Sequence, residues 1–346
     1  MNKRALRADI LLLLTAGIWG FGFVAQRSGM EYTGPFAYNG IRFILGSLSL
    51  LPLILWRRAS GSGEPGSREP GSNKLTKASI KKLCLYSSAA GGCLFIAVIL
   101  QQFGIMFTTA GNAGFITGLY VILTPLFGIF LGRKTGPATW LGSVFTLTGL
   151  YFLCAAGHLD SINPGDIITV ASAVFWACHV LVIDRLVQDI DPIALSAGQF
   201  AVCGVLALAG AFLAESFIHP LIERINPALL DAGTFAWLPF PALLAGLAAH
   251  TIVFPVDALV PILYGGLGSV GVAYTLQVVA QRDAPPAHAT IILCFEGCFA
   301  AFGGALLLSE KIGHWTLLGF ILMLAGMLVT QWEVIAKRAT TPSSVI

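Results

Sequence analysis

Residues 8–27, ADILLLLTAGIWGFGFVAQR, decide the fold of this chain. A charged residue stands near each end of the stretch, Asp9 and Arg27, and the residues between them are almost all apolar or small. About 20 helical residues at ~1.5 Å each cross the ~30 Å hydrocarbon core of a bilayer. The stretch therefore predicts a transmembrane helix. A basic segment precedes it and a second apolar run follows directly, so we expect the helix to be retained rather than removed as a signal peptide.

Similar apolar runs continue along the chain. Hydrophobic residues make up 56% of the 346 residues and charged residues only 11%, against roughly 25% charged in an ordinary soluble domain. The mean hydropathy of +0.82 also argues against a soluble fold. We therefore expect an all-α integral membrane protein with ten transmembrane helices, at residues 8–27, 35–56, 83–107, 110–132, 137–156, 166–187, 193–214, 259–281, 287–308 and 314–334.

The distribution of lysine and arginine predicts the orientation, because cytoplasmic loops of membrane proteins carry an excess of both. With ten spans and a cytoplasmic N-terminus, sixteen of the twenty basic residues lie on the cytoplasmic side. Only Arg27, Arg224 and Lys311 lie outside, and Arg42 lies inside a span. We expect both termini in the cytoplasm, and a place in the plasma (inner) membrane of a bacterium. The net charge of +3 gives no indication of nucleic-acid binding.

Two longer segments separate the apolar runs. Residues 58–82 are rich in Gly, Ser, Pro and charge, which is typical of a flexible cytoplasmic linker. Residues 215–258 form an outer insertion that holds the apolar, proline-broken stretch FAWLPFPALLAGLAA at 235–249. We expect this stretch to be interfacial or re-entrant, because a further crossing would place the basic C-terminal segment outside.

The chain also contains an internal repeat. A tryptophan is followed sixteen residues later by a proline and seven residues beyond that by a polar residue, as Trp19, Pro35 and Arg42 in one half and Trp176, Pro192 and Gln199 in the other. The halves are residues 1–157 and 158–346, each with five spans. Because five is odd, the second half is inverted relative to the first. Many secondary transporters share this arrangement and bind substrate near the midplane between the repeats.

Four segments resemble the ten-span EamA-type family of the drug/metabolite transporter superfamily: TAGIWGFGFVA at 15–25, PFAYNGIRFILGSLSLL at 35–51, GLYVILTPLFGIFLG at 118–132 and ILCFEGCFAAFGGALLLSE at 292–310. The resemblance covers most of residues 10–334 and implies a ten-helix fold with a transport role. The chain departs from the family pattern at Glu296-Gly297, where Glu-Pro is common, and at Arg133-Lys134, where an acidic residue is common. Its outer insertion is also longer.

Glu296 is the leading candidate for a functional residue. It lies about ten residues into the ninth predicted span, which puts its carboxyl group ~15 Å deep in the membrane. A charge at that depth costs about 2.5 to 3.5 kcal/mol on insertion scales, so the group should be protonated, paired or exposed to a wet cavity. The resemblance implies the same residue type at this place in similar proteins. The alternative is a neutral acid bonded to a neighbouring helix.

Arg42 and His179 are the next candidates. Arg42 lies about seven residues from the outer end of the second span, and could pair with Glu296, receive a substrate carboxylate, position helices or snorkel to the surface. His179 is mid-span, and either titrates near neutral pH or bonds a backbone carbonyl. Further candidates are polar or aromatic residues on several spans: Trp19, Asn39, Gln102, Tyr120, Trp176, Gln199, Tyr274 and Gln277.

Two motifs favour packing over chemistry. The segment GLGSVG at 266–271 matches a dinucleotide fingerprint, but it lies in an apolar span with no preceding strand, which favours close helix packing. Cys294 and Cys298 flank Glu296 without the further ligands that a zinc site needs. We therefore expect no metal and no cofactor.

These observations favour a secondary transporter that exports a small metabolite, amino acid or drug by alternating access. Its partners would be the substrate, the lipid bilayer and protons as the coupling ion, and it would act as a monomer or homo-oligomer. The sequence has no H-E-x-x-H motif and no two histidines four apart, which argues against a membrane-embedded enzyme. A channel or a scaffold subunit is the alternative. A single intramembrane arginine argues against phosphorylated substrates.

The charge distribution makes the topology testable. Reporter fusions at Ser62 and at the C-terminus should read as cytoplasmic, whereas fusions near Asp160, Asp231 and Lys311 should read as external. Paired alkaline phosphatase and fluorescent-protein reporters measure this, because each is active on one side of the membrane only. An external C-terminus would show that the outer insertion crosses the membrane.

Overall fold

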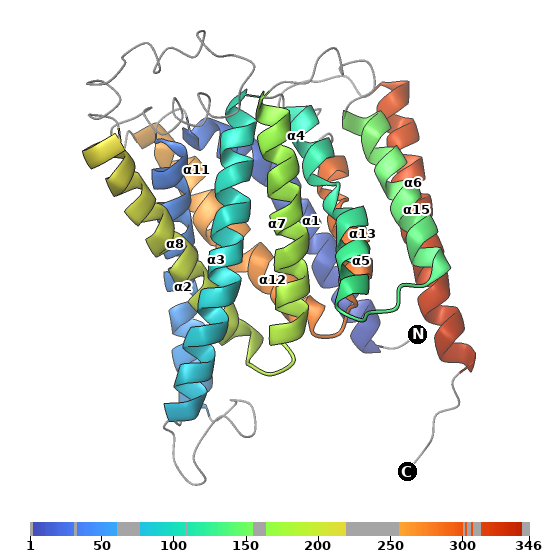
Figure 1. Ribbon diagram of the computed structural model, residues 1–346, viewed down its shortest axis with the longest axis horizontal. Coiled ribbons are helices and arrows are strands. Elements are labelled where there is room, and N and C mark those ends of the chain that lie inside the picture. Colours follow the sequence, from blue (N-terminus) through green and yellow to red (C-terminus); the bar gives the residue numbers. More distant parts are fainter. Residues whose placement is uncertain are drawn as a thin grey trace.

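The computed structural model describes residues 3–30, 33–60, 77–107, 110–154, 164–218, 256–299, 302, 306 and 313–340. Every secondary-structure element in these residues is a helix. The helices run side by side, and α1 begins and α15 ends at the same end of the molecule, the lower end in Figure 1. Seven described segments are long and apolar enough to cross a membrane, judged by length and composition. The predicted all-α membrane protein is confirmed.

The described helices coincide with the predicted spans, in chain order: α1 (Lys3–Met30), α2 (Pro35–Ala59), α3 (Lys77–Phe107), α4 (Ala110–Thr117) with α5 (Tyr120–Phe130), α6 (Pro137–Cys154), α7 (Pro164–Leu186), α8 (Pro192–Leu213), α11 (Leu259–Leu263) with η4 (Tyr264–Tyr274) and α12 (Thr275–Gln281), α13 (Pro286–Leu293) and α15 (His314–Thr340). The stretch η4 is a π-helix. It contains the segment 266–271, of which Gly266 and Gly271 lie against α2: an added Cβ at Gly266 would lie 2.6 Å from Leu45, and one at Gly271 would lie 2.5 Å from the Ser49 hydroxyl oxygen.

Several helices extend beyond the predicted spans. Residues at both ends of the predicted linker 58–82 are helical, because α2 continues to Ala59 and α3 begins at Lys77. Hydropathy marks only the hydrocarbon part of a helix, and the basic side chains at these ends are solvated beyond it. The rest of the linker lies outside the described residues. So does most of the outer insertion, including 235–249; its described ends are η1 (Ala214–Ile218) and η3 (Val256–Ala258).

Two predicted spans are broken near their middle. The fourth span is interrupted at Gly118 and Leu119, between α4 and α5, and the ninth at Cys294 and Phe295, after α13. Short turns keep the backbone paired at both places: Leu119 N donates to the Ile116 carbonyl at 3.1 Å, and Phe295 N donates to the Ile292 carbonyl at 3.1 Å. This pairing is required at membrane depth, where water cannot take the place of a lost backbone partner.

The outer surface of the helices is apolar and the interior holds many polar groups. On α15 the exposed residues Leu317, Ile321, Leu324 and Leu328 recur every three or four positions and so form one face. Polar side chains such as Asn39 lie fully buried instead. This distribution is the reverse of that in a soluble protein, and it fits a molecule whose surroundings are lipid.

Helix contacts follow a pattern that the two halves share. The main packed pairs are α6 with α15, α2 with α8, α3 with α7, α3 with α8, α1 with η4 and α2 with η4; α6 and α15 lie side by side at the right of Figure 1. Matching the five spans of the two halves in order pairs α1 with α7, α2 with α8 and α3 with η4. The contact of α3 with α7 then corresponds to that of η4 with α1, and the contact of α3 with α8 to that of η4 with α2. The pairs α2–α8 and α6–α15 correspond to themselves.

Small residues allow these helices to approach closely. An added Cβ at Gly142 of α6 would lie 2.7 Å from the Gly326 carbonyl oxygen of α15, and one at Gly204 of α8 would lie 2.9 Å from the Ile44 nitrogen of α2. Lipid tails are as apolar as leucine, so van der Waals packing at such contacts replaces the hydrophobic effect in holding the helices together.

Two neighbouring glycines of α3 provide a test of this packing. A Cβ at Gly91 would lie 2.7 Å from the Gln199 carbonyl oxygen of α8, whereas a Cβ at Gly92 would meet nothing within 4 Å. We expect Gly91→Ala to separate α3 from α8 and to cost about 1 to 3 kcal/mol. Gly92→Ala should be neutral or stabilising, because alanine favours a helix over glycine.

The melting temperature of each purified variant, measured by fluorescence-detected size exclusion, reports the difference. Equal melting temperatures for Gly91→Ala and Gly92→Ala would contradict close packing at this contact.

Candidate functional site

A small central cavity of about 30 Å³ lies among helices of both halves. Helices α1, α3, α4, α5, α7, η4, α12 and α13 line it, together with Glu296. The lining side chains are Trp19, Gln26, Gln101, Thr117, Tyr120, Trp176, Val180, Ser269, Tyr274, Gln277, Leu293 and Glu296. No single repeat unit forms this cavity alone.

Three aromatic rings form one wall of the cavity. The ring centroids of Trp19 and Tyr274 lie 4.5 Å apart, and those of Trp176 and Tyr274 lie 6.0 Å apart with the rings nearly parallel. The Trp19 and Trp176 rings, which hold corresponding places in the two halves, are 6.4 Å apart. A tilted arrangement of this kind presents flat apolar surface and electron-rich ring faces to the cavity.

The two helix breaks place Tyr120 and Glu296 at the cavity. Tyr120 is the first residue of α5, directly after one break, and Glu296 directly follows the other. The breaks meet in space, because the Cys294 Sγ lies 3.8 Å from the Gly118 carbonyl oxygen. Of the described residues that line the cavity, Glu296 is the only one with a charged group. Its carboxyl group therefore has no opposite charge beside it in the cavity wall.

Several buried polar atoms around the cavity have no hydrogen-bond partner in the described part of the protein. They are Gln26 Oε1, Trp176 Nε1 and Gln277 Oε1. Buried polar groups are nearly always bonded in proteins, so such a set marks a place where water or a ligand supplies the partners. Both donors and acceptors are present. The other tryptophan differs, because Trp19 Nε1 lies 3.4 Å from the Ser269 carbonyl oxygen that accepts its hydrogen.

Arg42 lies outside the cavity wall in a network on α2. Its Nε donates to Asn39 Oδ1 at 2.9 Å, and Asn39 Nδ2 donates to the Pro35 carbonyl at 2.8 Å. Its guanidinium carbon is 5.3 Å from the Tyr38 ring centre and 5.1 Å from that of Phe43. Among the described residues no ion pair joins Arg42 to Glu296. The ring of Phe43 links this network to the cavity wall, since its centroid lies 5.8 Å from that of Tyr274.

His179 and Gln199 form a buried pair behind Trp176. The His179 Nε2 and Gln199 Oε1 atoms are 2.9 Å apart, and both side chains are fully buried. The partner of His179 is thus a side-chain amide rather than a backbone carbonyl. The His179 ring meets the Trp176 ring edge-on at 6.0 Å. Gln102 is also fully buried, away from the cavity lining, and neither of its amide atoms has a partner in the described residues.

The cavity brings together six of the eleven predicted candidates: Trp19, Tyr120, Trp176, Tyr274, Gln277 and Glu296. The other five, Arg42, Asn39, Gln102, His179 and Gln199, lie behind it. Gln26, Gln101, Thr117 and Ser269 line the cavity but were not among the candidates. Gln26 and Gln101 could have been found as polar groups on apolar spans. Thr117 and Ser269 carried no such signal, because such hydroxyls in membrane helices often bond the backbone.

Known proteins match most of this chain. The family model for the EamA-like transporter family matches the chain twice, at residues 6–155 and 163–332. A protein of Archaeoglobus fulgidus described as an uncharacterized transporter is 22% identical over 328 residues, which cover 94% of this chain and 97% of that protein. The uncharacterized inner membrane transporter YedA of Escherichia coli is 24% identical over 198 residues, 57% of this chain and 60% of YedA.

A solved crystal structure has the same fold. It superimposes with a TM-score of 0.67 and 16% identity, covering 96% of this chain and 99% of that chain. The two matches of the family model together span most of the sequence and divide it between the two halves. The chain belongs to the EamA-like transporter family.

Proposed function

We propose that this protein is a secondary exporter of a small metabolite, amino acid or drug, and that Glu296 exchanges a proton for a basic or hydrogen-bond-donating group of the substrate. The observation that carries the proposal is the position of Glu296, which has the only carboxyl group among the described residues that line the cavity.

The chemistry of the cavity favours a substrate with a positive or donating group. A carboxylate attracts an ammonium group much more strongly in a low-dielectric site than in water. Tryptophan and tyrosine faces also attract cations, and they pack against the flat apolar part of a ligand. The free oxygens of Gln26 and Gln277 add hydrogen-bond acceptors.

Proton coupling follows from competition for one carboxyl group. Glu296 in the membrane interior is stable when it holds a proton or when it faces a cation, and it cannot hold both at once. Proton binding from one side would therefore release substrate, and substrate binding from the other side would release the proton. Exchange of this kind would use the inward proton gradient for export.

The repeats provide a route to alternating access. The matching contacts of the two halves and the mixed origin of the cavity wall support two inverted five-helix units, residues 1–157 and 158–346, around a shared site. Movement of one unit against the other would open the cavity to each side in turn. We place the protein in the inner membrane of a bacterium with both termini in the cytoplasm, on the strength of its charge distribution.

Glu296→Gln separates coupling from binding. The amide keeps the shape of the side chain but neither ionises nor carries a proton, so proton-driven accumulation in proteoliposomes should fall at least about tenfold while substrate exchange without a gradient continues. Asp189→Asn, at an exposed turn between α7 and α8, is the matched control and should transport normally.

A ligand-stabilisation screen against metabolite pools would first identify the substrate, because a ligand that binds the native state raises the melting temperature of the protein. Unchanged rate, affinity and pH dependence in Glu296→Gln would remove Glu296 from the site. An ionic current without saturable flux would indicate a channel instead.

Trp176→Phe tests the unpartnered indole nitrogen. Phenylalanine keeps an aromatic face but lacks the donor, and because Trp176 Nε1 has no partner in the described protein, the change should cost little stability. We expect the substrate dissociation constant to rise about five- to tenfold, as for a lost hydrogen bond of about 1 to 1.5 kcal/mol. Equilibrium binding and melting temperature measure the two effects. A lower melting temperature with unchanged affinity would assign Trp176 a packing role only.

A further inference from the structure

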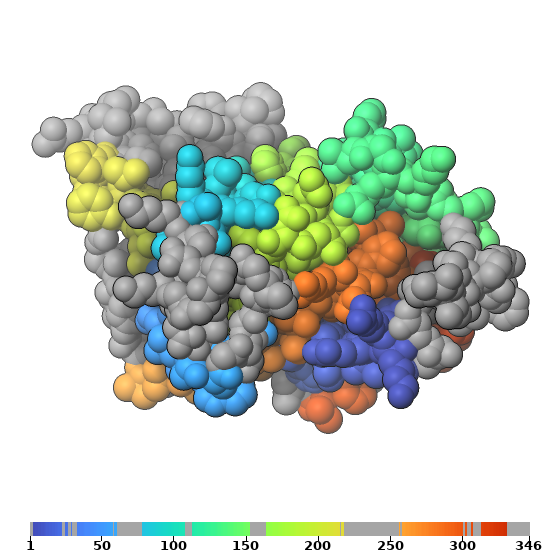
Figure 2. Space-filling model, turned by 90° about the horizontal axis from the view of Figure 1, so that it is seen from below, coloured from blue at the N-terminus to red at the C-terminus, as the bar shows by residue number. Residues whose placement is uncertain are grey.

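A second pocket, separate from the central cavity, opens at the end of the molecule where α1 begins. Its volume is about 480 Å³. The start of α1, the end of α2, the start of α8 and the end of α12 surround it. Figure 2 views this end of the molecule, with the start of α1 in dark blue and the end of α2 in light blue. Both halves of the chain thus contribute to the pocket.

Charged side chains surround the pocket, and the positive ones are in excess. Four arginines line it, Arg4, Arg7, Arg57 and Arg282, together with Asp191 and Asp283. Four positive and two negative groups leave a net charge of +2. Guanidinium groups bind phosphate oxygens through two parallel hydrogen bonds, which makes such a cluster suited to phosphate-bearing anions.

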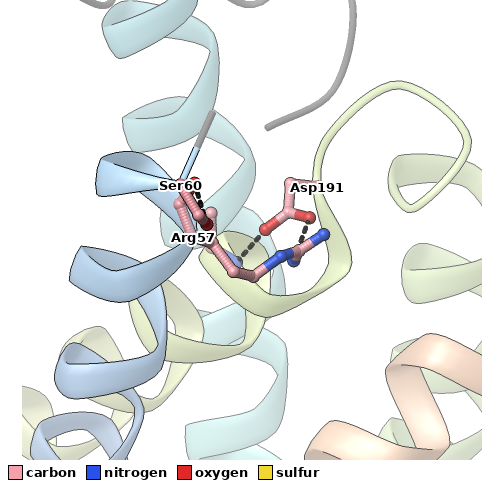
Figure 3. Close-up of polar contacts among 4 residues, drawn as sticks. Arg57, Ser60 and Asp191 are labelled. Atoms are coloured by element: carbon pink, nitrogen blue, oxygen red, sulfur yellow. Dashed lines mark hydrogen bonds and ion pairs between the residues drawn. The ribbon is translucent and has the colours of Figure 1, made fainter. Parts of the chain in front are cut away.

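One of the aspartates is already engaged. The Arg57 Nη1 lies 2.9 Å from Asp191 Oδ1, a contact that joins the end of α2 to the start of α8 in Figure 3. The other carboxylate oxygen, Oδ2, accepts a hydrogen bond of 3.0 Å from the Ala194 nitrogen and so caps α8. Asp191 therefore orients Arg57 at the pocket, and its charge is shared between two partners.

The remaining lining is apolar. Ala8, Leu11, Ile193, Val279 and Ala280 line the pocket between the charged groups. Ala8 and Ala280 are almost fully buried, at 2% and 1% exposure. Leu11, Ile193 and Val279 are partly exposed, so a ligand with a phosphate group and an adjoining hydrocarbon chain would contact both the guanidinium groups and these apolar side chains.

A third pocket at the same end has lining basic groups that already lie against carboxylates. It is lined by Arg133, Lys134 and His288, but Arg133 forms an ion pair with Asp184 and His288 with Asp9. Two of its three basic groups are thus matched by carboxylates from α7 and α1. The arginine pocket has four arginines in its described lining, against one in the third pocket.

We propose that the arginine pocket binds the phosphate of an anionic ligand, first of all the headgroup of an anionic phospholipid of the cytoplasmic leaflet. Basic pockets between transmembrane helices on the cytoplasmic side recognise such headgroups. A bound headgroup would connect helices of both halves at one end of the molecule. It would therefore stabilise the folded protein in proportion to its occupancy.

The test uses the full-length protein in zwitterionic phosphatidylcholine nanodiscs and two probes, short-chain phosphatidylglycerol and inorganic phosphate. Binding and melting temperature are measured for the wild type and for Arg4→Gln/Arg7→Gln. The matched control is Lys81→Gln/Arg185→Gln, which removes two exposed positive charges outside the pocket. At about fivefold per guanidinium, we expect the first double variant to bind phosphatidylglycerol about 25-fold more weakly. The control should bind as the wild type does.

The two probes distinguish the source of the phosphate. A higher melting temperature with phosphatidylglycerol and a small effect of inorganic phosphate support a lipid headgroup. Equal stabilisation by inorganic phosphate supports the anion site but replaces the lipid by a soluble phosphate ligand. Equal affinity in the wild type and Arg4→Gln/Arg7→Gln, or an equal loss in the control variant, would overturn the proposal. Because neither measurement uses transport, the result is independent of the role of Glu296.

Discussion

The need to pair every backbone N–H and C=O group without help from water determines most of this structure. It explains why the described elements are helices, and it restricts helix breaks to places that protein surrounds. The breaks at Gly118–Leu119 and Cys294–Phe295 meet this condition, because short turns pair their amides and the two breaks contact each other. The same restriction brings Tyr120 and Glu296 to the centre of the molecule.

The lipid surroundings also restrict where charged side chains lie. The described ion pairs join helix ends, as in Arg57–Asp191 between α2 and α8 and Arg133–Asp184 between the end of α5 and α7. At the exposed turn after α7, a hydrogen bond from Tyr86 and the charge of Lys82 hold the pKa of Asp189 below its usual range. Among the described residues of the cavity wall Glu296 is the exception, and its carboxyl group is the one that the proposed exchange of protons and cations requires.

The positions of the spans could be predicted from the sequence because hydropathy over twenty residues is a strong signal. The breaks could not, since Leu119, Cys294 and Phe295 are apolar residues that continue a helix pattern. Some of the residues that line the cavity could be predicted. Gln277 and Gln199 are the same residue type on neighbouring spans, yet Gln277 lines the cavity and Gln199 bonds His179. The direction in which each side chain points depends on how the helices pack, and a single sequence does not show that packing.

The π-helix η4 gives the wall of the cavity a way to rotate. Its eleven residues are wound more widely than an α-helix, and each π turn contains one residue more than an α turn. Converting one such turn to α-helix would rotate the following residues by one helical position, about 100°. Tyr274 and Gln277 would then change direction relative to Ser269. Each N–H would then bond the carbonyl four residues back instead of five, so the backbone would be paired in both forms, as the membrane interior requires.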